Sequence, residues 1–332
     1  MFRSAIVGCG AIANTHAGNL AKMHNVVISA VCDILPERAN KIKETYAPEA
    51  LVFDDYKKML DEVKPDVLHV CTPHYLHSEM AVEALKRNIN VMLEKPVSIS
   101  LAQARAIIDA EKESSGRVCV SFQNRFLKRN KTAKELVSSG KAGKVIFASG
   151  SVLWSRGESY YRDSHWRGFK ATEGGGVMIN QAIHTLDLLQ WICGEPEKLC
   201  AKTANFHLQG VIDVEDTCDA YLYFKDGGHG MFHATTANFE DAPVSLTVKC
   251  ENMLLELKND DLYIDGVKQE LHDSAEIIDG KPYWGAGHKM LFNAFYSAIE
   301  TGEPMPVTVA DAIPAVKLLL AMYASDGKDI EL

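Results

Sequence analysis

Residues 2–13 read FRSAIVGCGAIA, and this stretch indicates which fold the chain adopts. An apolar run is followed by Gly8-Cys9-Gly10-Ala11-Ile12-Ala13, which is a G-x-G-x-x-A pattern. The first glycine permits a tight turn, the second lets backbone approach a pyrophosphate, and the small Ala13 lets a helix pack closely on a strand. The N–H groups at the start of that helix attract phosphate. The pattern therefore predicts a strand, a dinucleotide-binding turn and a helix, with a plain tight turn as the alternative.

An acidic residue at the end of the next predicted strand strengthens this interpretation. Asp33 ends VVISAVCD (26–33), and a carboxylate at that place accepts hydrogen bonds from both ribose hydroxyls. It also repels a 2′-phosphate, and Ile34 and Leu35 have no group that could hold one. These residues favour NAD over NADP as the cofactor, although Arg38 could reach a 2′-phosphate from the following helix.

The first 122 residues alternate apolar runs with helical patterns. Strands that are apolar throughout are buried on both faces, and their alternation with helices predicts a parallel, doubly wound sheet. The expected strands are 2–8, 26–33, 66–73, 89–96 and 118–122, and the expected helices lie near 13–23, 36–46, 56–63, 77–87 and 100–114. We therefore expect an N-terminal NAD-binding Rossmann domain over residues 1–122.

Polar residues follow two of these strands. In open α/β sheets, ligands bind beyond the carboxyl ends of the strands, so we expect these residues to contact the cofactor. They are Thr72, Pro73, His74 and His77 after one strand, and Glu94 and Lys95 after the next. A lysine between VMLE and a proline is poorly explained as a surface residue, whereas either histidine could simply cap the following helix.

From about residue 123 the pattern changes. Long alternating strands follow one another without helices between them, which predicts a mostly antiparallel, open sheet with one face that needs cover. The expected strands are 144–154, 197–206, 216–224, 228–238 and 244–258 with a hairpin at 260–271, and the expected helices lie near 131–139, 286–301 and 308–325. Residues 123–332 are therefore expected to form a second α/β domain, and the family resemblance of its motifs, given below, implies that it binds substrate and another subunit.

The segment EGGGVMINQAIHTLDLLQW (173–191) is the main helix predicted in this half. Asn180 and His184 lie four residues apart, so on one helix they project from the same side. We interpret the preceding glycines as permitting the close approach of a nicotinamide ring or a sugar. The alternative is a buried pair of His184 and Asp187 that holds the helix in place.

Composition and charge exclude several classes of protein. The chain has 332 residues, which favours two domains. Its net charge of -9, without a long basic run, argues against nucleic acid and anionic membranes as partners. No apolar stretch has the length of a membrane span, and the first residues lack a secretory pattern. The eight cysteines form no C-x-x-C pair, which favours buried thiols in a reducing cytoplasm.

Together these motifs resemble the Gfo/Idh/MocA family of oxidoreductases, which includes glucose–fructose oxidoreductase and inositol dehydrogenase. The resemblance spans essentially the whole chain and rests on GCGAIA (8–13), CTPHYLH (71–77), EKP (94–96), QNRF (123–126), WRG (166–168) and GGGVMINQAIH (174–184). It implies a Rossmann domain followed by an α/β domain whose open sheet packs against another subunit, in a homodimer or homotetramer. It also implies a sugar, cyclic polyol or derivative as substrate, and no metal.

The resemblance assigns roles to individual residues. Lys95 matches a lysine that contacts both the nicotinamide and the reacting hydroxyl, and His184 matches the histidine usually taken as the acid/base. Asn180 stands where many members have Asp; a neutral amide can orient a substrate hydroxyl but does little to the pKa of the imidazole. This departure favours Lys95 over His184 as the catalytic base. Trp166 and Arg167 match a pair that reaches the cofactor from the second domain.

A further set of residues is expected to line the substrate site. The loop 155–167 is aromatic and charged, which suits the faces and hydroxyls of a sugar, although it could equally be a dimer contact or a lid. Candidate substrate contacts are Tyr160, Trp166 and Arg125, and Asn124 is a candidate cofactor contact. Tyr283 and Trp284 could also approach the cofactor.

The implied reaction is the reversible, NAD-dependent oxidation of a secondary alcohol of a sugar or cyclitol. Hydride leaves the carbinol carbon for nicotinamide C4, while Lys95 or His184 takes the hydroxyl proton. One alternative is oxidation followed by elimination and re-reduction, which cleaves a glycoside without net redox change. The other is a non-catalytic regulator that senses NAD or sugar, and the presence of both Lys95 and His184 argues against it.

Overall fold

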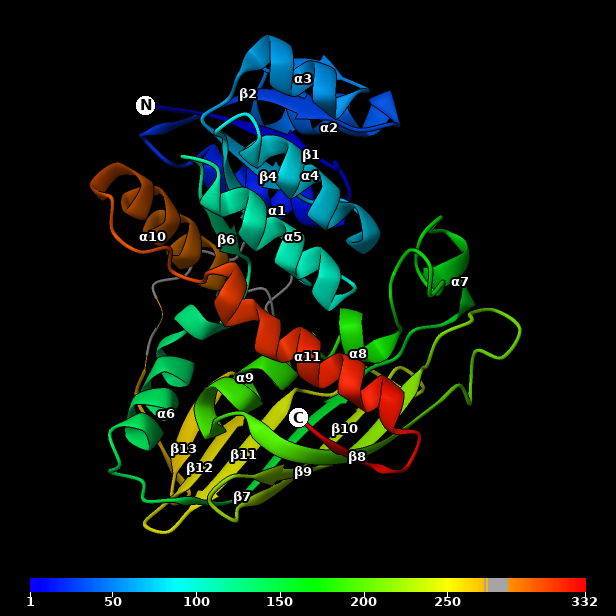
Figure 1. Cartoon of the computed structure of the whole chain (residues 1–332), viewed down its shortest axis with the longest axis vertical. Helices are drawn as coiled ribbons and strands as arrows, with labels where there is room; N and C mark the ends of the chain where they lie inside the picture. The colour runs from blue at the N-terminus through cyan, green and yellow to red at the C-terminus, as the bar shows by residue number, and fades with distance from the viewer. Residues whose placement is uncertain (272, 274–285) are drawn as a thin grey trace. The chain divides into compact units, whose positions relative to one another are not determined.

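The computed structural model describes residues 1–271, 273 and 286–332. Their contacts divide the chain into two compact units, each built on its own sheet (Figure 1). The first comprises Met1–Gln123 with the described residues of Ser274–Ile313, and the second comprises Asn124–Asp273 with Pro314–Leu332. The first expected domain ended at residue 122, with all later residues in the second. The segment 286–313 instead groups with the first unit, a long-range contact that local sequence patterns do not reveal.

The first unit contains a parallel sheet of six strands in the order β3-β2-β1-β4-β5-β6, which confirms the doubly wound prediction. Its strands are β1 (Phe2–Val7), β2 (Val26–Cys32), β3 (Leu51–Phe53), β4 (Val67–Val70), β5 (Asn90–Leu93) and β6 (Val118–Val120). The sequence patterns missed β3, because it is only three residues long and is defined by its pairing with β2.

Helices surround this sheet (Figure 1). They are α1 (Ala11–Leu20), α2 (Pro36–Tyr46), α3 (Tyr56–Val63), α4 (His77–Leu85), α5 (Leu101–Lys112) and α10 (Gly287–Thr301), with the short 3₁₀ helix η1 (His74–Leu76) before α4. The strands between them are almost entirely buried, as runs that are apolar on both faces require. Helix α1 packs against both α2 and α10.

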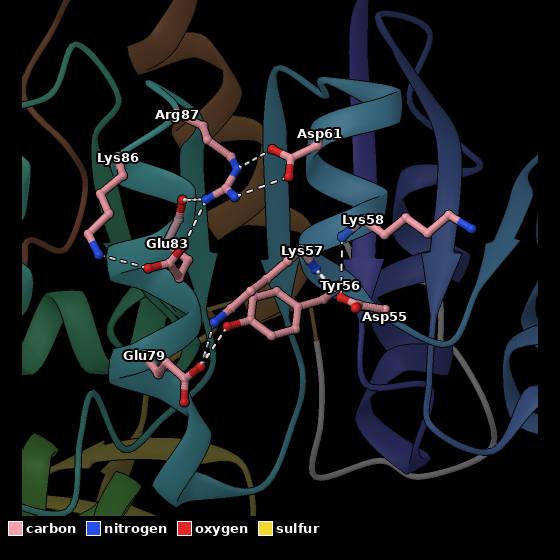
Figure 2. A network of polar contacts seen from close by, with 9 residues as sticks. All are labelled: Asp55, Tyr56, Lys57, Lys58, Asp61, Glu79, Glu83, Lys86 and Arg87. Carbon is pink, nitrogen blue, oxygen red and sulfur yellow. Dashed lines mark hydrogen bonds and ion pairs between the residues drawn. The ribbon is translucent and has the colours of Figure 1, made fainter.

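Ion pairs and hydrogen bonds join the surfaces of α3 and α4 (Figure 2). The Arg87 guanidinium contacts Asp61 at 2.7 Å and Glu83 at 2.9 Å. The Lys86 and Arg87 cations lower the pKa of Glu83 to about 2. Closer to the start of both helices, the Tyr56 hydroxyl donates to Glu79 at 2.8 Å. This network fixes the two helices side by side.

The second unit contains a nine-stranded sheet in the order β14-β13-β12-β11-β7-β10-β9-β8-β15. All neighbouring strands are antiparallel except β7 and β10, which confirms the mostly antiparallel prediction. Its strands are β7 (Val145–Leu153), β8 (Pro196–Ala204), β9 (Thr217–Phe224), β10 (His229–Thr235), β11 (Ser245–Cys250), β12 (Leu254–Lys258), β13 (Asp261–Ile264), β14 (Val267–Lys268) and β15 (Asp329–Glu331). The edge strand β15 was not predicted, because only its pairing with β8 defines it.

Helices cover one face of this sheet (Figure 1). They are α6 (Lys128–Ser138), α8 (Val177–Asn180) and α9 (Ile183–Cys193). The unit also contains α7 (Glu158–Arg162), which lies in the loop after β7, and the second part of α11 (Val309–Ser325), and the 3₁₀ helix η2 (Gln123–Phe126) leads into α6. On the other face, Tyr221, Tyr223 and Met231 are exposed, and Met231 lies directly opposite Tyr221. The expected open sheet, with one face covered by helices, is therefore confirmed within this unit.

The single helix predicted over 173–191 is wrong. The structure has two short helices, α8 and α9, separated at Gln181 and Ala182, whose N–H groups both donate to the carbonyl of Val177. Asn180 is consequently the last residue of α8 and His184 the second residue of α9. Their four-residue spacing crosses a break, so regular helix geometry does not relate their side chains.

All eight cysteines are free thiols, and six of them are buried, in agreement with the prediction. Burial raises the pKa of Cys9, Cys32 and Cys119 to about 12, which makes these thiols unreactive. Within the described part of the chain, no helix is long and apolar enough to cross a membrane.

Candidate active site

The glycine-rich turn after β1 has the geometry that a pyrophosphate requires. Gly8 has a φ of +84°, and a Cβ there would lie 2.7 Å from the backbone carbonyl of Cys71, so only glycine fits. A Cβ on Gly10 would meet none of the described residues within 4 Å, so the backbone is open to a ligand on that side. Helix α1 starts at Ala11 without a side-chain cap and without an acidic residue in its first turn. Its first N–H groups therefore suit an anion.

Asp33 stands beside this turn at the end of β2. Its Oδ2 accepts a hydrogen bond from the N–H of Cys9 at 2.7 Å, and its Oδ1 accepts one from the N–H of Leu35 at 2.9 Å. The two bonds fix the carboxylate next to Gly10, while each oxygen keeps capacity for another donor. The residues present thus fit NAD, with the pyrophosphate at the turn formed by Gly8 to Ala13 and the ribose at Asp33.

His77 joins the two polar strand ends. Its ring nitrogens lie 2.7 Å from the carbonyl oxygen of Pro96 and 2.9 Å from that of Thr72. The imidazole is fully buried, and burial lowers its pKa. His74 is also buried, with its ring 5.7 Å from that of His77. These contacts make His77 a support for the two loops instead of a helix cap, and its contact with the cofactor stays a prediction.

The buried carboxylate of Glu94 contacts His16, a residue that the sequence analysis did not single out. His16 Nε2 lies 2.9 Å from Glu94 Oε1, and both side chains are buried. His288 Nε2 approaches the same oxygen at 3.8 Å, and the ligand atoms of the three residues lie within 4.8 Å of one another. The shortest contact is a direct hydrogen bond, so we assign the cluster to the support of Glu94. Lys95 follows directly, partly exposed at the carboxyl edge of the sheet.

In the second unit, the loop 155–167 forms a stack of rings and guanidinium groups. The guanidinium carbon of Arg167 lies 4.6 Å from the centre of the Tyr160 ring and 5.0 Å from that of Trp166. The guanidinium of Arg156 lies 5.5 Å from the same tyrosine ring, and Gln181 donates to the tyrosine hydroxyl. The structure thus brings three of the predicted residues together: Tyr160, Trp166 and Arg167.

Glu173 fastens this loop to Asn180. Its Oε2 accepts a hydrogen bond from the N–H of Gly168 at 2.5 Å, and its Oε1 accepts one from Nδ2 of Asn180 at 2.5 Å. The side chain is only 1% exposed, and burial raises its pKa to about 7. Sequence reasoning gave Glu173 no role, although an acidic residue directly before three glycines and an apolar run was a usable signal.

Packing within the second unit requires two of the glycines after Glu173, Gly175 and Gly176. A Cβ on Gly175 would lie 1.9 Å from the hydroxyl of Tyr323, and one on Gly176 would lie 1.8 Å from the backbone carbonyl of Glu215. The Glu215 carboxylate also accepts the N–H of Gly176 at 2.8 Å and the Tyr323 hydroxyl at 2.9 Å. Gly175 and Gly176 therefore accommodate neighbouring parts of the same unit.

Arg125 and Asp187 form a buried ion pair. Arg125 donates to both carboxylate oxygens of Asp187, at 2.6 and 2.8 Å, and its guanidinium lies 5.5 Å from the Trp191 ring. This ion pair gives Arg125 a structural role beside the predicted one. Asn124 accepts the side-chain N–H of Asn130 at its carbonyl. Tyr283 and Trp284 lie outside the described residues.

Comparison with known proteins identifies the class. Residues 2–122 match the model of the oxidoreductase family with an NAD-binding Rossmann fold, and residues 130–256 match the Gfo/Idh/MocA C-terminal domain. The chain therefore belongs to the Gfo/Idh/MocA oxidoreductase family and has an NAD-binding Rossmann domain. The two matches confirm the resemblance that its motifs indicated.

Two relatives and one solved structure show which known dehydrogenases the chain is similar to. The chain is 30% identical to D-glucoside 3-dehydrogenase of Escherichia coli K12 over 72% of its own length and 64% of that protein. It is 28% identical to inositol 2-dehydrogenase of Salmonella paratyphi B over 59% of its length and 56% of that protein. These alignments thus span less than two thirds of either relative. A structure of the WlbA dehydrogenase from Bordetella pertussis, in complex with NADH and UDP-GlcNAcA, superimposes with a TM-score of 0.87 at 25% identity, over 100% of this chain and 98% of that one.

Proposed function

We propose that this protein is an NAD-dependent dehydrogenase that oxidises a secondary hydroxyl of a sugar, a cyclitol or a sugar derivative. The observation that carries the proposal is the arrangement at the carboxyl edge of the parallel sheet. The glycine turn and Asp33 fit NAD, and Lys95 stands at the same edge, two strands from the turn. The glucoside and inositol dehydrogenases similar to this chain support the choice of substrate class.

In this mechanism, NAD supplies the hydride acceptor when it is bound. Lys95 in its neutral form accepts the proton of the reacting hydroxyl, and its N–H groups hold the oxygen in place as the proton leaves. His184 is the second candidate for the base, because an imidazole starts near neutrality. Asn180 orients a neighbouring hydroxyl, and Tyr160, Trp166 and Arg167 offer ring faces and a cation for the rest of the sugar.

Asp33 accounts for the choice of cofactor. Its carboxylate is fixed by the N–H groups of Cys9 and Leu35, so it cannot turn away from a ribose 2′ position. A 2′-phosphate there would face a buried negative charge. We therefore expect NAD to bind more tightly than NADP.

The open face of the large sheet suits a second copy of this chain. Tyr221, Tyr223 and Met231 lie exposed on it in neighbouring strands, and exposed apolar patches of this kind mark interaction surfaces. We propose a homodimer or homotetramer formed through this face. Light scattering of the protein and of a Tyr221→Glu variant tests this: a monomeric wild type contradicts it.

The direct test follows two signals in one assay. Purified protein is incubated with NAD⁺ and a panel of free sugars, cyclitols, sugar acids, glycosides and nucleotide sugars, and both NADH absorbance and loss of substrate are recorded. NADH formed with one class supports the proposal and names the substrate group. Loss of a glycoside without NADH indicates the oxidation–elimination cycle instead. No change in either signal, with NAD bound, indicates a regulator.

A further inference from the structure

Behind Asn180 lies a buried carboxylate whose two oxygens are both used. Glu173 accepts the Gly168 N–H through one oxygen and the Asn180 amide N–H through the other, each at 2.5 Å. Above its pKa, the ionised carboxylate can only accept hydrogen bonds, so the amide nitrogen of Asn180 must then face it. The opposite orientation would press the Asn180 carbonyl oxygen against a carboxylate oxygen that is buried from solvent.

We propose that Glu173 is a positioning residue that fixes the amide of Asn180 so that its carbonyl oxygen, an acceptor, is presented to a hydroxyl of the sugar. The inference rests on the proposed function and deepens it. It assigns Asn180 one polarity: the substrate group at this place is a donor, such as a hydroxyl next to the reacting carbon, and a carbonyl or carboxylate oxygen there would be rejected.

The surroundings of Glu173 make this polarity sensitive to pH. Burial raises its pKa to about 7, the Gly168 N–H, Asn180 and Arg167 oppose the rise, and the nearby Glu215 carboxylate adds to it. Tyr160, Tyr161 and Tyr323 also face the carboxyl group, and their own pKa values are raised, so they stay neutral. Below this pKa the protonated Glu173 can donate, and the amide of Asn180 can then turn its oxygen inward and its nitrogen outward.

Glu173 also explains why an amide, and not a carboxylate, suits position 180. The negative charge lies on Glu173, one side chain further from the substrate than position 180. The amide dipole of Asn180, oriented by this charge, turns its carbonyl oxygen toward the substrate. An aspartate at position 180 would bring two carboxylates into contact, which disfavours ionisation of both. The two positions are thus expected to be coupled.

Four proteins test the coupling: wild type, Glu173→Gln, Asn180→Asp and the double variant. In Glu173→Gln, the new amide oxygen keeps the Gly168 N–H, and the new amide nitrogen turns the Asn180 amide around. We expect kcat/KM for the best sugar to fall about 10- to 100-fold, the loss of one or two hydrogen bonds, with a melting temperature no lower than that of wild type. In the double variant, the glutamine at position 173 donates to the aspartate at position 180, which again presents an acceptor. We expect kcat/KM to return to within about 5-fold of wild type.

Glu215→Gln is the matched control. Glu215 is a similarly buried carboxylate at the same glycines, but it binds the N–H groups of Gly176 and Met178 and the Tyr323 hydroxyl. Glu215→Gln is expected to have a lower melting temperature than wild type, and adding Asn180→Asp should restore neither the melting temperature nor kcat/KM. Equal losses in Glu173→Gln and in the double variant would overturn the proposal.

The same proteins separate this inference from the proposed function. If wild type reduces no NAD⁺ with any sugar, the proposed function fails. The pairing is then judged by stability alone: Asn180→Asp should lower the melting temperature at pH 8 by about 2–4 °C, and Glu173→Gln should abolish that loss. A loss of the same size in both backgrounds overturns the fixed polarity of Asn180.

Discussion

His16 Nε2 lies 2.9 Å from Glu94 Oε1, and this contact ends a buried chain of hydrogen bonds that runs through the first unit. His16 Nδ1 lies 2.9 Å from Nδ1 of His69, whose Nε2 lies 2.8 Å from the Tyr296 hydroxyl, which in turn contacts Ser4 at 2.6 Å. Burial lowers the pKa of both histidines, so both rings are neutral. One arrangement of protons then satisfies every contact, with each group donating toward the Glu94 carboxylate.

Replacing His16 by Leu is expected to destabilise the protein by about 3–5 kcal/mol, because a buried carboxylate loses its hydrogen-bonded partner. The His16 hydrogen bond also holds the pKa of Glu94 well below its usual range, against the burial that raises it. Urea denaturation at pH 7 measures the loss. The double variant with Glu94→Gln removes the charge as well and should recover part of it. A single variant as stable as wild type contradicts the assigned support.

Glu173 is expected to make stability fall as pH rises. Its pKa is about 7 in the folded protein and 4.5 in the unfolded chain, so the folded state binds more protons between these values. The free energy of unfolding should therefore decrease by up to about 3 kcal/mol from pH 4.5 to 7, at about 1.4 kcal/mol per pH unit. The difference between wild type and Glu173→Gln isolates this contribution. A difference that does not change with pH argues against the raised pKa.

Alanine at Gly175 or Gly176 is expected to cost more than about 3 kcal/mol or to prevent folding, because its Cβ would lie 1.9 or 1.8 Å from atoms of Tyr323 and Glu215. Thermal unfolding of the soluble fraction measures the effect. Gly157→Ala is the control, since a Cβ there meets nothing within 4 Å and the backbone φ is −81°. Normal stability of the Gly175 variant would show that the packing is adaptable.

Lys95→Ala is expected to abolish turnover while NAD still binds, because the glycine turn and Asp33 are untouched. Isothermal titration with NADH measures binding, and NADH absorbance measures turnover. We expect a loss of about 10³-fold or more in kcat, the combined effect of general base and positioning. A variant with activity near that of wild type would remove Lys95 from the mechanism and leave His184 as the base.

The first unit was more predictable from sequence than the second. The turn at residues 8–13 and the polar strand ends follow local rules, because parallel strands place their carboxyl ends at one edge. The helix break at Gln181 was missed, since the apolar periodicity continues across it. The partners of the glycines were also missed, because Tyr323 is far from them in sequence. The role of Glu173 depends on a contact with Gly168 that no spacing rule anticipates.

The most direct test of the account is transfer of a labelled hydrogen. Wild-type protein is mixed with NAD⁺ and a sugar, identified from the panel, that carries deuterium at the reacting carbon, and the NADH formed is analysed by mass spectrometry. The account predicts that NADH gains the deuterium and that the rate falls about 2- to 5-fold where hydride transfer limits turnover. Consumption of the labelled sugar with no deuterium in any NADH released would contradict a dehydrogenase.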